Sequence, residues 1–114
     1  MPLPTIRKTE VLAQSRFFTI EAMHLTFSNG VERVYERLPA VGEQGVIVVA
    51  VNDNDELLLI REYAAGFHEF QLTLPKGAAD PGEALEDAAA RELAEEAGFG
   101  ARDVRFVKRL SIAP

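Results

Sequence analysis

The sequence contains no cysteine among its 114 residues. This absence excludes disulfide bonds and thiolate chemistry, and it fits a protein of the reducing cytoplasm. A surplus of basic residues is also missing, because 12 lysines and arginines stand against 18 aspartates and glutamates, for a net charge of −6 at pH 7. We therefore expect neither a nucleic acid nor a membrane as a partner. A nucleotide substrate is still allowed, since a bound cation reverses the local sign of the charge.

Long apolar runs are missing too. The longest, residues 46–51, is far shorter than the roughly 20 residues that a membrane-spanning helix needs. Residues 1–8 include no apolar stretch of signal-peptide length. What is present is a hydrophobic content of 47%, which is ordinary for a globular chain and sufficient for a core.

The first third of the chain predicts a small antiparallel sheet. Residues 1–8 carry two prolines and predict an irregular lead-in. Aromatic and β-branched residues predict one short strand and two long strands after it, at residues 9–13, 17–27 and 31–37. Asn29-Gly30 lies between the two long strands, and this pair is a strong hairpin signal because both residues tolerate a positive φ.

Residues 39–44 contain proline and glycine and show no periodicity. We place a boundary there, between an N-terminal sheet domain of residues 1–44 and a second domain of residues 45–114.

The second domain predicts strands followed by one helix. The expected elements, in chain order, are a fully buried strand at 45–51, its hairpin partner at 56–63, a strand at 70–74, a loop at 77–82, a helix at 83–97 and a final strand at 104–110. Gly98 is well placed to cap the helix in the left-handed conformation.

The end of the predicted helix carries an unusual cluster of carboxylates. Glu92, Glu95 and Glu96 are spaced to share one face and about one turn. They lie at the helix C-terminus, where the macrodipole disfavours anions, and Arg91 is the cation beside them. Such a cluster calls for an external cation, and Mg²⁺ prefers oxygen ligands of this kind. The simpler alternatives are a solvent-facing acidic surface and an ion pair of Arg91 with Asp87.

The phase of the helix favours a site over a solvent face. At 100° per residue, Leu85, Ala88, Ala89 and Glu92 lie on one stripe, which Glu95 and Glu96 flank. The stripe is therefore apolar in its first half and acidic in its second half. Because carboxylates at core positions are costly unless paired or metal-bound, we expect the first half to pack on a sheet and the second half to line a cleft.

The same stretch resembles the Nudix box, the signature of the Nudix hydrolases. The fixed positions of that box are occupied by Gly77, Glu83, Arg91, Glu92, Leu93, Glu95, Glu96, Gly98 and Phe99. Phe99 is aromatic where an aliphatic residue is usual. Further segments, at residues 27–30, 34–37, 59–63, 76–77, 80–83 and 111–114, resemble the ADP compounds hydrolase (NudE) branch of the family, which is related to the ADP-ribose pyrophosphatases.

The resemblance implies a fold and an activity. The fold is an α/β (α+β) Nudix fold, a mixed sheet with the box loop and helix, preceded by the small antiparallel sheet. The activity is metal-dependent hydrolysis of the pyrophosphate bond in ADP-linked compounds, with Mg²⁺ or Mn²⁺ as cofactor and AMP as product. Glu92 and Glu96 are the implied main ligands, Glu95 is a ligand or a water-mediated partner, and Lys76 offers its backbone carbonyl. Arg91 is expected to pair with Glu83 or to orient a glutamate.

Four residues are candidates for substrate contacts. Arg61 and Tyr63 end a strand beside the expected cleft, Arg37 follows the N-terminal sheet, and Gly77 permits a close approach of phosphate or metal. Ordinary exposure at a strand edge is the alternative for Arg61 and Tyr63. The resemblance implies that the N-terminal sheet, sometimes from a partner subunit, holds the adenosine part. We also expect a homodimer, because the sheet of residues 9–38 has a limited core of its own.

Two departures from related sequences shape the remaining expectations. Ala64 and Thr73 stand near positions where ADP-ribose-specific relatives carry arginine and glutamate, which favours a broader range of substrates: NADH, diadenosine polyphosphates and ADP-ribose. Nudix domains also continue with more strands, a catalytic-base loop and a final helix, so we expect the chain to be incomplete at its C-terminus. The alternative functions are a non-catalytic Nudix module that binds a nucleotide or a protein, and an inactive fragment of the enzyme.

Overall fold

The computed structural model describes residues 1–39 and 44–111. These residues fall into two compact units, one formed by residues 1–39 with 108–111 and the other by residues 44–107. Within the described ranges, no helix is long and apolar enough to cross a membrane.

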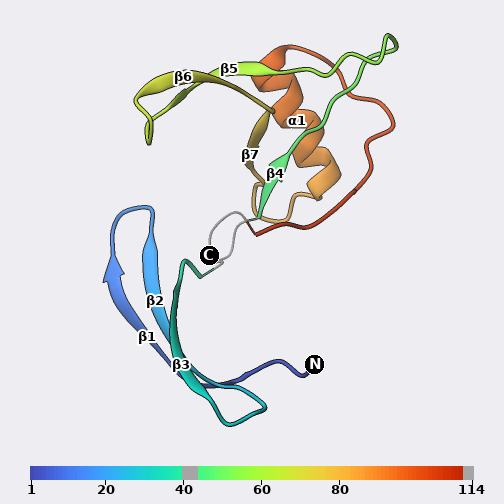
Figure 1. Cartoon of the computed structure of the whole chain (residues 1–114). Coiled ribbons are helices and arrows are strands. Elements are labelled where there is room, and N and C mark those ends of the chain that lie inside the picture. The colour runs from blue at the N-terminus through green and yellow to red at the C-terminus, as the bar shows by residue number, and fades with distance from the viewer. Residues whose placement is uncertain (40–43, 112–114) are drawn as a thin grey trace. The chain divides into compact units, whose positions relative to one another are not determined.

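The first unit contains a three-stranded antiparallel sheet, drawn in blue to blue-green in Figure 1. Its strands are β1 (Thr5–Gln14), β2 (Thr19–Thr26) and β3 (Glu32–Arg37), with β2 in the centre. The predicted sheet is confirmed, but β1 already begins at Thr5, inside the segment expected to be irregular. Thr5 and Ile6 follow Pro4 directly, and both are β-branched residues that favour strands. The strand therefore begins at the first residue after the proline.

The hairpin between β2 and β3 lies at the predicted place but uses a different turn. Gly30 has a φ of 82°, whereas Asn29 is not among the residues with positive φ. The Phe27 amide donates to Val31 and the Gly30 amide donates back to Phe27. This is the longer hairpin loop with one left-handed glycine, and not the two-residue turn that Asn-Gly suggested.

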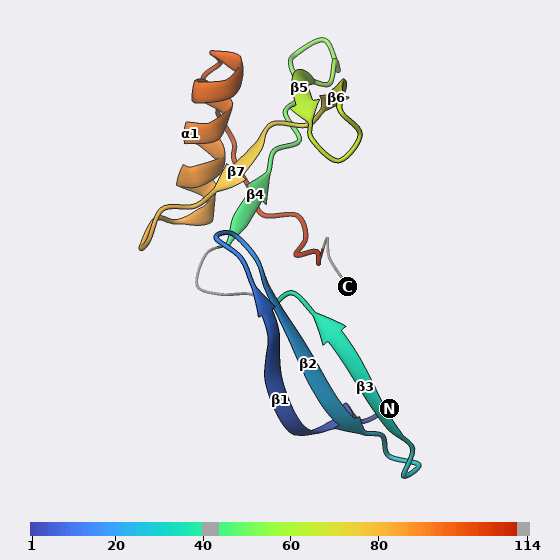
Figure 2. The same ribbon diagram turned by 90° about the vertical axis from the view of Figure 1, so that its left-hand side faces the viewer.

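The second unit is built around one helix and a short pair of strands. β4 (Gly45–Ile47) pairs antiparallel with β7 (Lys76–Ala78), so that Val46 lies opposite Gly77. Helix α1 (Leu85–Ala97) lies along both strands, as Figures 1 and 2 show from two directions. Pro75, Ala79, Ala88 and Leu93 form the small core between them.

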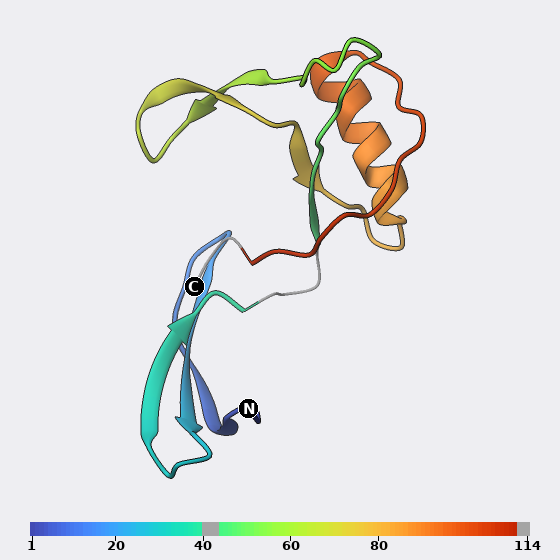
Figure 3. The same ribbon diagram turned by 45° about the vertical axis from the view of Figure 1, so that its right-hand side comes forward.

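The remaining strands form a two-stranded ribbon. β5 (Ile60–Ala64) pairs with β6 (Glu69–Thr73), and the ribbon extends away from α1 in Figure 3. β6 confirms the strand expected at 70–74. The hairpin expected between residues 45–51 and 56–63 is wrong for most of its length, because β4 pairs with β7 and only Val51 and Leu57 form a bridge.

Two further predictions, a strand at 104–110 and full burial of the strand at 45–51, are wrong because the described residues supply no neighbouring strand for the first and no second covering layer for the other. Residues 104–110 form no strand, and among the described residues no strand edge pairs with them. The strand expected to be fully buried has Ile47, Val49 and Val51 exposed. A strand is buried only when a layer covers each face, and in the described part of this unit a single helix covers one.

The helix itself follows the sequence closely. It begins at Leu85, two residues later than expected, because Ala84 is still extended with a ψ of 143°. Gly98 ends it in the left-handed conformation, with a φ of 74° and its amide bonded to the carbonyl of Ala94. The predicted glycine cap is confirmed.

Candidate active site

Among the residues that the structure describes, Glu92 is the buried carboxylate, with 9% of its surface exposed. Its side chain rests directly on the backbone of Gly77 in β7. A Cβ atom built on Gly77 would lie 2.2 Å from both Cδ and Oε1 of Glu92. The glycine therefore makes the space that the carboxylate fills, which gives a physical reason for these two residues to occur together in the box.

Arg91 connects the box loop to the helix. Its guanidinium donates to both oxygens of Glu83, with Nε to Oε2 at 3.0 Å and Nη2 to Oε1 at 2.9 Å. It also donates to Oε1 of Glu92 at 3.0 Å and to the backbone carbonyl of Ala78 at 2.9 Å. The expected pairing with Glu83 is present, and so is the contact that orients a glutamate. Among the Arg91 contacts in the described part of the chain, none is with Asp87.

These bonds fix the charge state of the loop. The hydrogen bonds from Arg91, helped by the Asp80 amide, lower the pKa of Glu83 from its usual 4.5 to about 2. In return, Glu83 raises the pKa of Arg91. The pair is thus fully ionised at neutral pH, and a bidentate arginine–carboxylate contact of this kind also fixes geometry.

Glu96 approaches the same strand from the next turn of the helix. Its Oε2 accepts a hydrogen bond from the backbone amide of Lys76 at 3.0 Å. Glu92 and Glu96 therefore meet β7 at adjoining residues, Gly77 and Lys76. Glu95 is different, because its side chain is 58% exposed and contacts Arg91 at 3.3 Å rather than strand β7.

The side chain of Lys76 makes a second connection. Its Nζ pairs with the carboxylate of Glu62 on β5. Lys76 thus joins the ribbon through its side chain and the helix through its backbone amide. Sequence reasoning considered only its carbonyl, and no signal in the sequence pointed to Glu62 as its partner.

The donor set suits a hard divalent cation. Glu92, Glu95 and Glu96 supply only carboxylate oxygens, which Mg²⁺ and Mn²⁺ prefer. In residues 1–39 and 44–111, however, no three acidic or histidine side chains are grouped closely enough to enclose an ion. Glu92 is instead satisfied by Arg91 and Glu96 by the Lys76 amide. The three glutamates thus offer the type of ligand that the metal prefers. In this structure, the hydrogen bonds to Glu92 and Glu96 come from a guanidinium and a backbone amide.

One hollow is formed by the box loop, at the other end of the helix from the glutamates. A shallow pocket of about 250 Å³ is lined by the box loop and its neighbours, Gln44, Ala79, Asp80, Pro81, Gly82, Glu83 and Leu85. The sequence predicted a cleft along the acidic half of the helix. In the described residues, the carboxylate at core phase is instead packed against strand β7.

The three arginine and tyrosine candidates lie outside this cluster. Arg37, at the end of β3, donates to Glu21 at 3.1 Å within the first unit. Arg61 and Tyr63 lie on β5, where Arg61 stacks on Phe70 and the Tyr63 hydroxyl contacts His68 Nδ1 at 2.7 Å. His68, in the turn of the ribbon, is thus part of an aromatic group.

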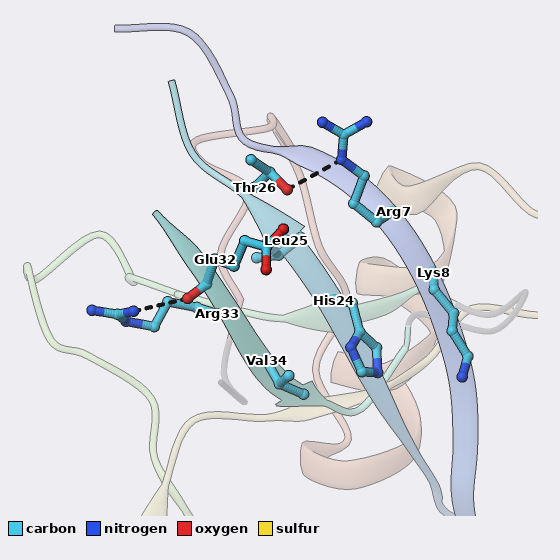
Figure 4. Close-up of a pocket in the computed structure, with 8 residues that line it drawn as sticks. All are labelled: Arg7, Lys8, His24, Leu25, Thr26, Glu32, Arg33 and Val34. Atoms are coloured by element: carbon cyan, nitrogen blue, oxygen red, sulfur yellow. Dashed lines mark hydrogen bonds between the residues drawn. The ribbon is translucent and has the colours of Figure 1, made fainter. Parts of the chain in front are cut away.

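A second hollow lies on the N-terminal sheet and was missed by sequence reasoning. This pocket of about 490 Å³ is lined from all three strands by Arg7, Lys8, His24, Leu25, Thr26, Glu32, Arg33 and Val34 (Figure 4). His24 contacts Glu10 at 3.2 Å, and this bond is the main reason why the pKa of Glu10 is lowered. Alternation along a strand predicts which residues share a face of the sheet, but it does not predict where a pocket forms on that face.

Comparisons with known proteins agree with the geometry. Residues 4–37 match the family model of the NudE-type Nudix hydrolase N-terminal domain, and residues 43–113 match that of the NUDIX domain. The ADP compounds hydrolase NudE of Escherichia coli strain K12 is 52% identical over 111 residues, which is 97% of this chain and 59% of that protein. The RNA pyrophosphohydrolase of Photorhabdus laumondii is 42% identical over 60 residues, or 53% of this chain and 32% of that protein.

A solved structure bears on the fold. The crystal structure of an ADP compounds hydrolase matches with a TM-score of 0.83 at 51% identity, over 100% of this chain and 61% of that one. The expected Nudix fold is therefore confirmed, and this chain spans about three fifths of the length of these two ADP compounds hydrolases. With the box helix seated on its glycine and the NUDIX model matching more than half of the sequence, the chain belongs to the Nudix hydrolase family.

Proposed function

We propose that this protein hydrolyses the pyrophosphate bond of ADP-linked compounds and releases AMP. The substrates are ADP-ribose, NADH and diadenosine polyphosphates, and the cofactor is Mg²⁺ or Mn²⁺. One observation carries the proposal: a buried carboxylate, Glu92, is seated on Gly77 beside a second carboxylate, Glu96. The name of the similar ADP compounds hydrolase from Escherichia coli supports the choice of substrate class.

In this proposal the chain's own residues prepare an anionic site. Arg91 holds Glu92 through a 3.0 Å hydrogen bond, and the Lys76 amide holds Glu96. Glu92 and Glu96 are the main ligands, Glu95 is a further ligand or a water-mediated partner, and the carbonyl of Lys76 is the backbone ligand. A divalent cation held there supplies positive charge to phosphate oxygens and makes water more acidic.

The other candidates take the substrate. Gly77 lets phosphate or metal approach the backbone beside Glu92 closely, Arg61 and Tyr63 contact the nucleotide, and Arg37 of the N-terminal domain holds the adenosine part. We propose that residues 1–44 serve substrate binding and dimerisation, that residues 45–114 carry catalysis, and that the enzyme is a cytoplasmic homodimer. Apolar side chains exposed on β1 and β3, such as Val11 and Val34, support a role of that sheet in association.

The direct test is AMP release from ADP-ribose, NADH and diadenosine triphosphate, with Mg²⁺ and after its removal by a chelator. We expect metal-dependent release, and a loss of about 10²–10³ in kcat for Glu92→Gln and for Glu96→Gln. Glu86→Gln is the matched control, because Glu86 lies exposed in the first turn of the same helix. The absence of metal-dependent release from all three compounds contradicts the proposal. Tight nucleotide binding without release favours the binding module instead.

A further inference from the structure

The two faces of the β5–β6 ribbon differ in chemistry. Tyr63 lies opposite Phe70 and Arg61 opposite Leu72, and directly opposed residues share one face of an antiparallel pair. This face, which we call the ring face, consists of Arg61, Tyr63, Phe70 and Leu72. Tyr63 is 50% exposed and Phe70 is 63% exposed. The other face carries Glu62, which is tied to Lys76.

The aromatic rings of the ring face are held in fixed orientations. The Tyr63 and Phe70 centroids are 5.9 Å apart with an interplanar angle of 66°, an edge-to-face arrangement that is favourable for aromatic pairs. The Tyr63 hydroxyl is fixed by His68, whose ring is also 5.9 Å away. Two large rings are therefore exposed to solvent and already ordered, which reduces the entropy cost of binding a planar ligand.

The charge of the ring face selects the ligand. The Arg61 guanidinium lies over the Phe70 ring, 5.2 Å from its centroid, and no carboxylate of residues 1–39 or 44–111 forms a salt bridge with it. In a chain of net charge −6, this is a cation left without an anionic partner in the described part. A ring surface that carries a guanidinium without a carboxylate partner among the described residues complements a planar base joined to a phosphate.

The ribbon is also linked to the candidate active site. Glu62 on the opposite face of β5 binds the Lys76 side chain, and the Lys76 amide donates to Glu96. The position of the ribbon is thereby coupled to the helix that carries the box glutamates.

We propose that the ring face is a nucleobase-stacking subsite, in which Tyr63 and Phe70 contact the base and Arg61 contacts the attached phosphate. The proposal rests on the proposed function for the class of nucleotide and adds Phe70, which sequence reasoning did not single out. The base comes from one of two sources, the ADP half of the substrate or the ring of its other half. Both present the same chemistry to the rings.

The test measures binding without turnover, by titration calorimetry with AMP and with ribose 5-phosphate in the presence of a chelator. We expect Phe70→Leu to weaken AMP binding about tenfold and to leave ribose 5-phosphate binding unchanged. Phe67→Leu is the matched control, because Phe67 is 74% exposed in the turn of the same ribbon and has no part in the ring face. Circular dichroism verifies that both variants keep the fold.

Charge is tested separately. Arg61→Gln should weaken AMP and ribose 5-phosphate alike, whereas Arg105→Gln, an exposed change of equal charge outside the ribbon, should weaken neither. Equal AMP affinity of the wild type and Phe70→Leu overturns the proposal, as does an equal loss in Phe67→Leu. A change in sedimentation mass in Phe70→Leu without a change in AMP affinity also overturns it, because the face then binds a second copy.

Hydrolysis rates then assign the source of the base. If the ADP half is stacked, Phe70→Leu lowers kcat/KM for ADP-ribose and for diadenosine triphosphate alike. If the second ring is stacked, only the diadenosine compound is affected. Either result supports the subsite. A wild-type chain that binds AMP through Phe70 but hydrolyses nothing refutes the proposed function and leaves the subsite standing.

Discussion

Replacing Gly77 by alanine tests how the site is built. The added Cβ atom would lie 2.2 Å from Cδ and Oε1 of Glu92 and 2.5 Å from Oε2. Favourable carbon contacts begin at about 3.5 Å, so the carboxylate must retreat by more than about 1 Å. The displaced atoms are the end of a side chain, and we therefore expect a destabilisation of about 1 kcal/mol, at the lower end for overpacking.

The effect on the reaction is expected to be much larger than the effect on stability. A displacement of about 1 Å in a positioned group typically costs about a hundredfold in rate. Urea unfolding followed by circular dichroism gives the stability, and AMP release gives the rate. Gly66→Ala is the control, because a Cβ there meets no atom within 4 Å and should change stability by no more than about 0.5 kcal/mol.

A double-mutant comparison isolates the contact. When Glu92 is first shortened to alanine, the atoms that the new Cβ meets are gone. Gly77→Ala should then cost no more than Gly66→Ala. An equal cost of Gly77→Ala with and without the Glu92 side chain would refute the reasoning, because another contact would then explain the requirement for glycine.

Two further predictions concern stability. Arg91 lowers the pKa of Glu83 to about 2 from a usual 4.5, so the ionised Glu83 stabilises the folded state above pH 4.5, and this stabilisation is lost as the pH falls toward 2. Glu83→Gln should therefore flatten the pH dependence of the free energy of unfolding between pH 4.5 and 2. An unchanged slope would contradict the pairing. Gly98→Ala places a side chain at a φ of 74° and should cost about 1 kcal/mol in thermal unfolding. Gly100→Ala, which has no positive φ and meets nothing within 4 Å, serves as the control, and equal melting temperatures of the two variants would show that the cap is not strained.

Local signals predicted the local structure well. Gly98 capped α1 as expected, because glycine just after the last helical turn is a local signal for a left-handed helix end. Helical phase also placed Glu92 among the buried residues. The pairing of Arg91 with Glu83 was anticipated from the box, although the sequence did not show that one guanidinium also contacts Glu92 and Ala78.

Pairings between distant segments were not predictable in the same way. β7 is only three residues of Lys-Gly-Ala, a composition with little strand propensity, and the loop that the sequence predicts at 77–82 overlaps its last two residues. It is a strand because β4 pairs with it and α1 packs on it. Residues 104–110 are the converse case, since they have strand propensity but no partner edge in the described residues. Strand formation depends on such neighbours more than on intrinsic preference.

The exposure of side chains in the two pockets and on the ring face could not be predicted from the sequence either. Alternation places Tyr63 and Arg61 on one face of β5, but their exposure depends on which element covers that face. The link from Glu62 through Lys76 to Glu96 joins three separate elements. No periodicity in the sequence reports a contact of that kind.

The central claim is that the carboxylates seated on β7 hold a divalent cation. Binding of Mn²⁺ to the chain, followed by electron paramagnetic resonance, tests it without any substrate. The account predicts saturable binding that is at least about tenfold weaker in Glu92→Gln and in Glu96→Gln and unchanged in Glu86→Gln. Equal Mn²⁺ affinity in all four proteins, or no saturable binding to the wild type, would contradict it.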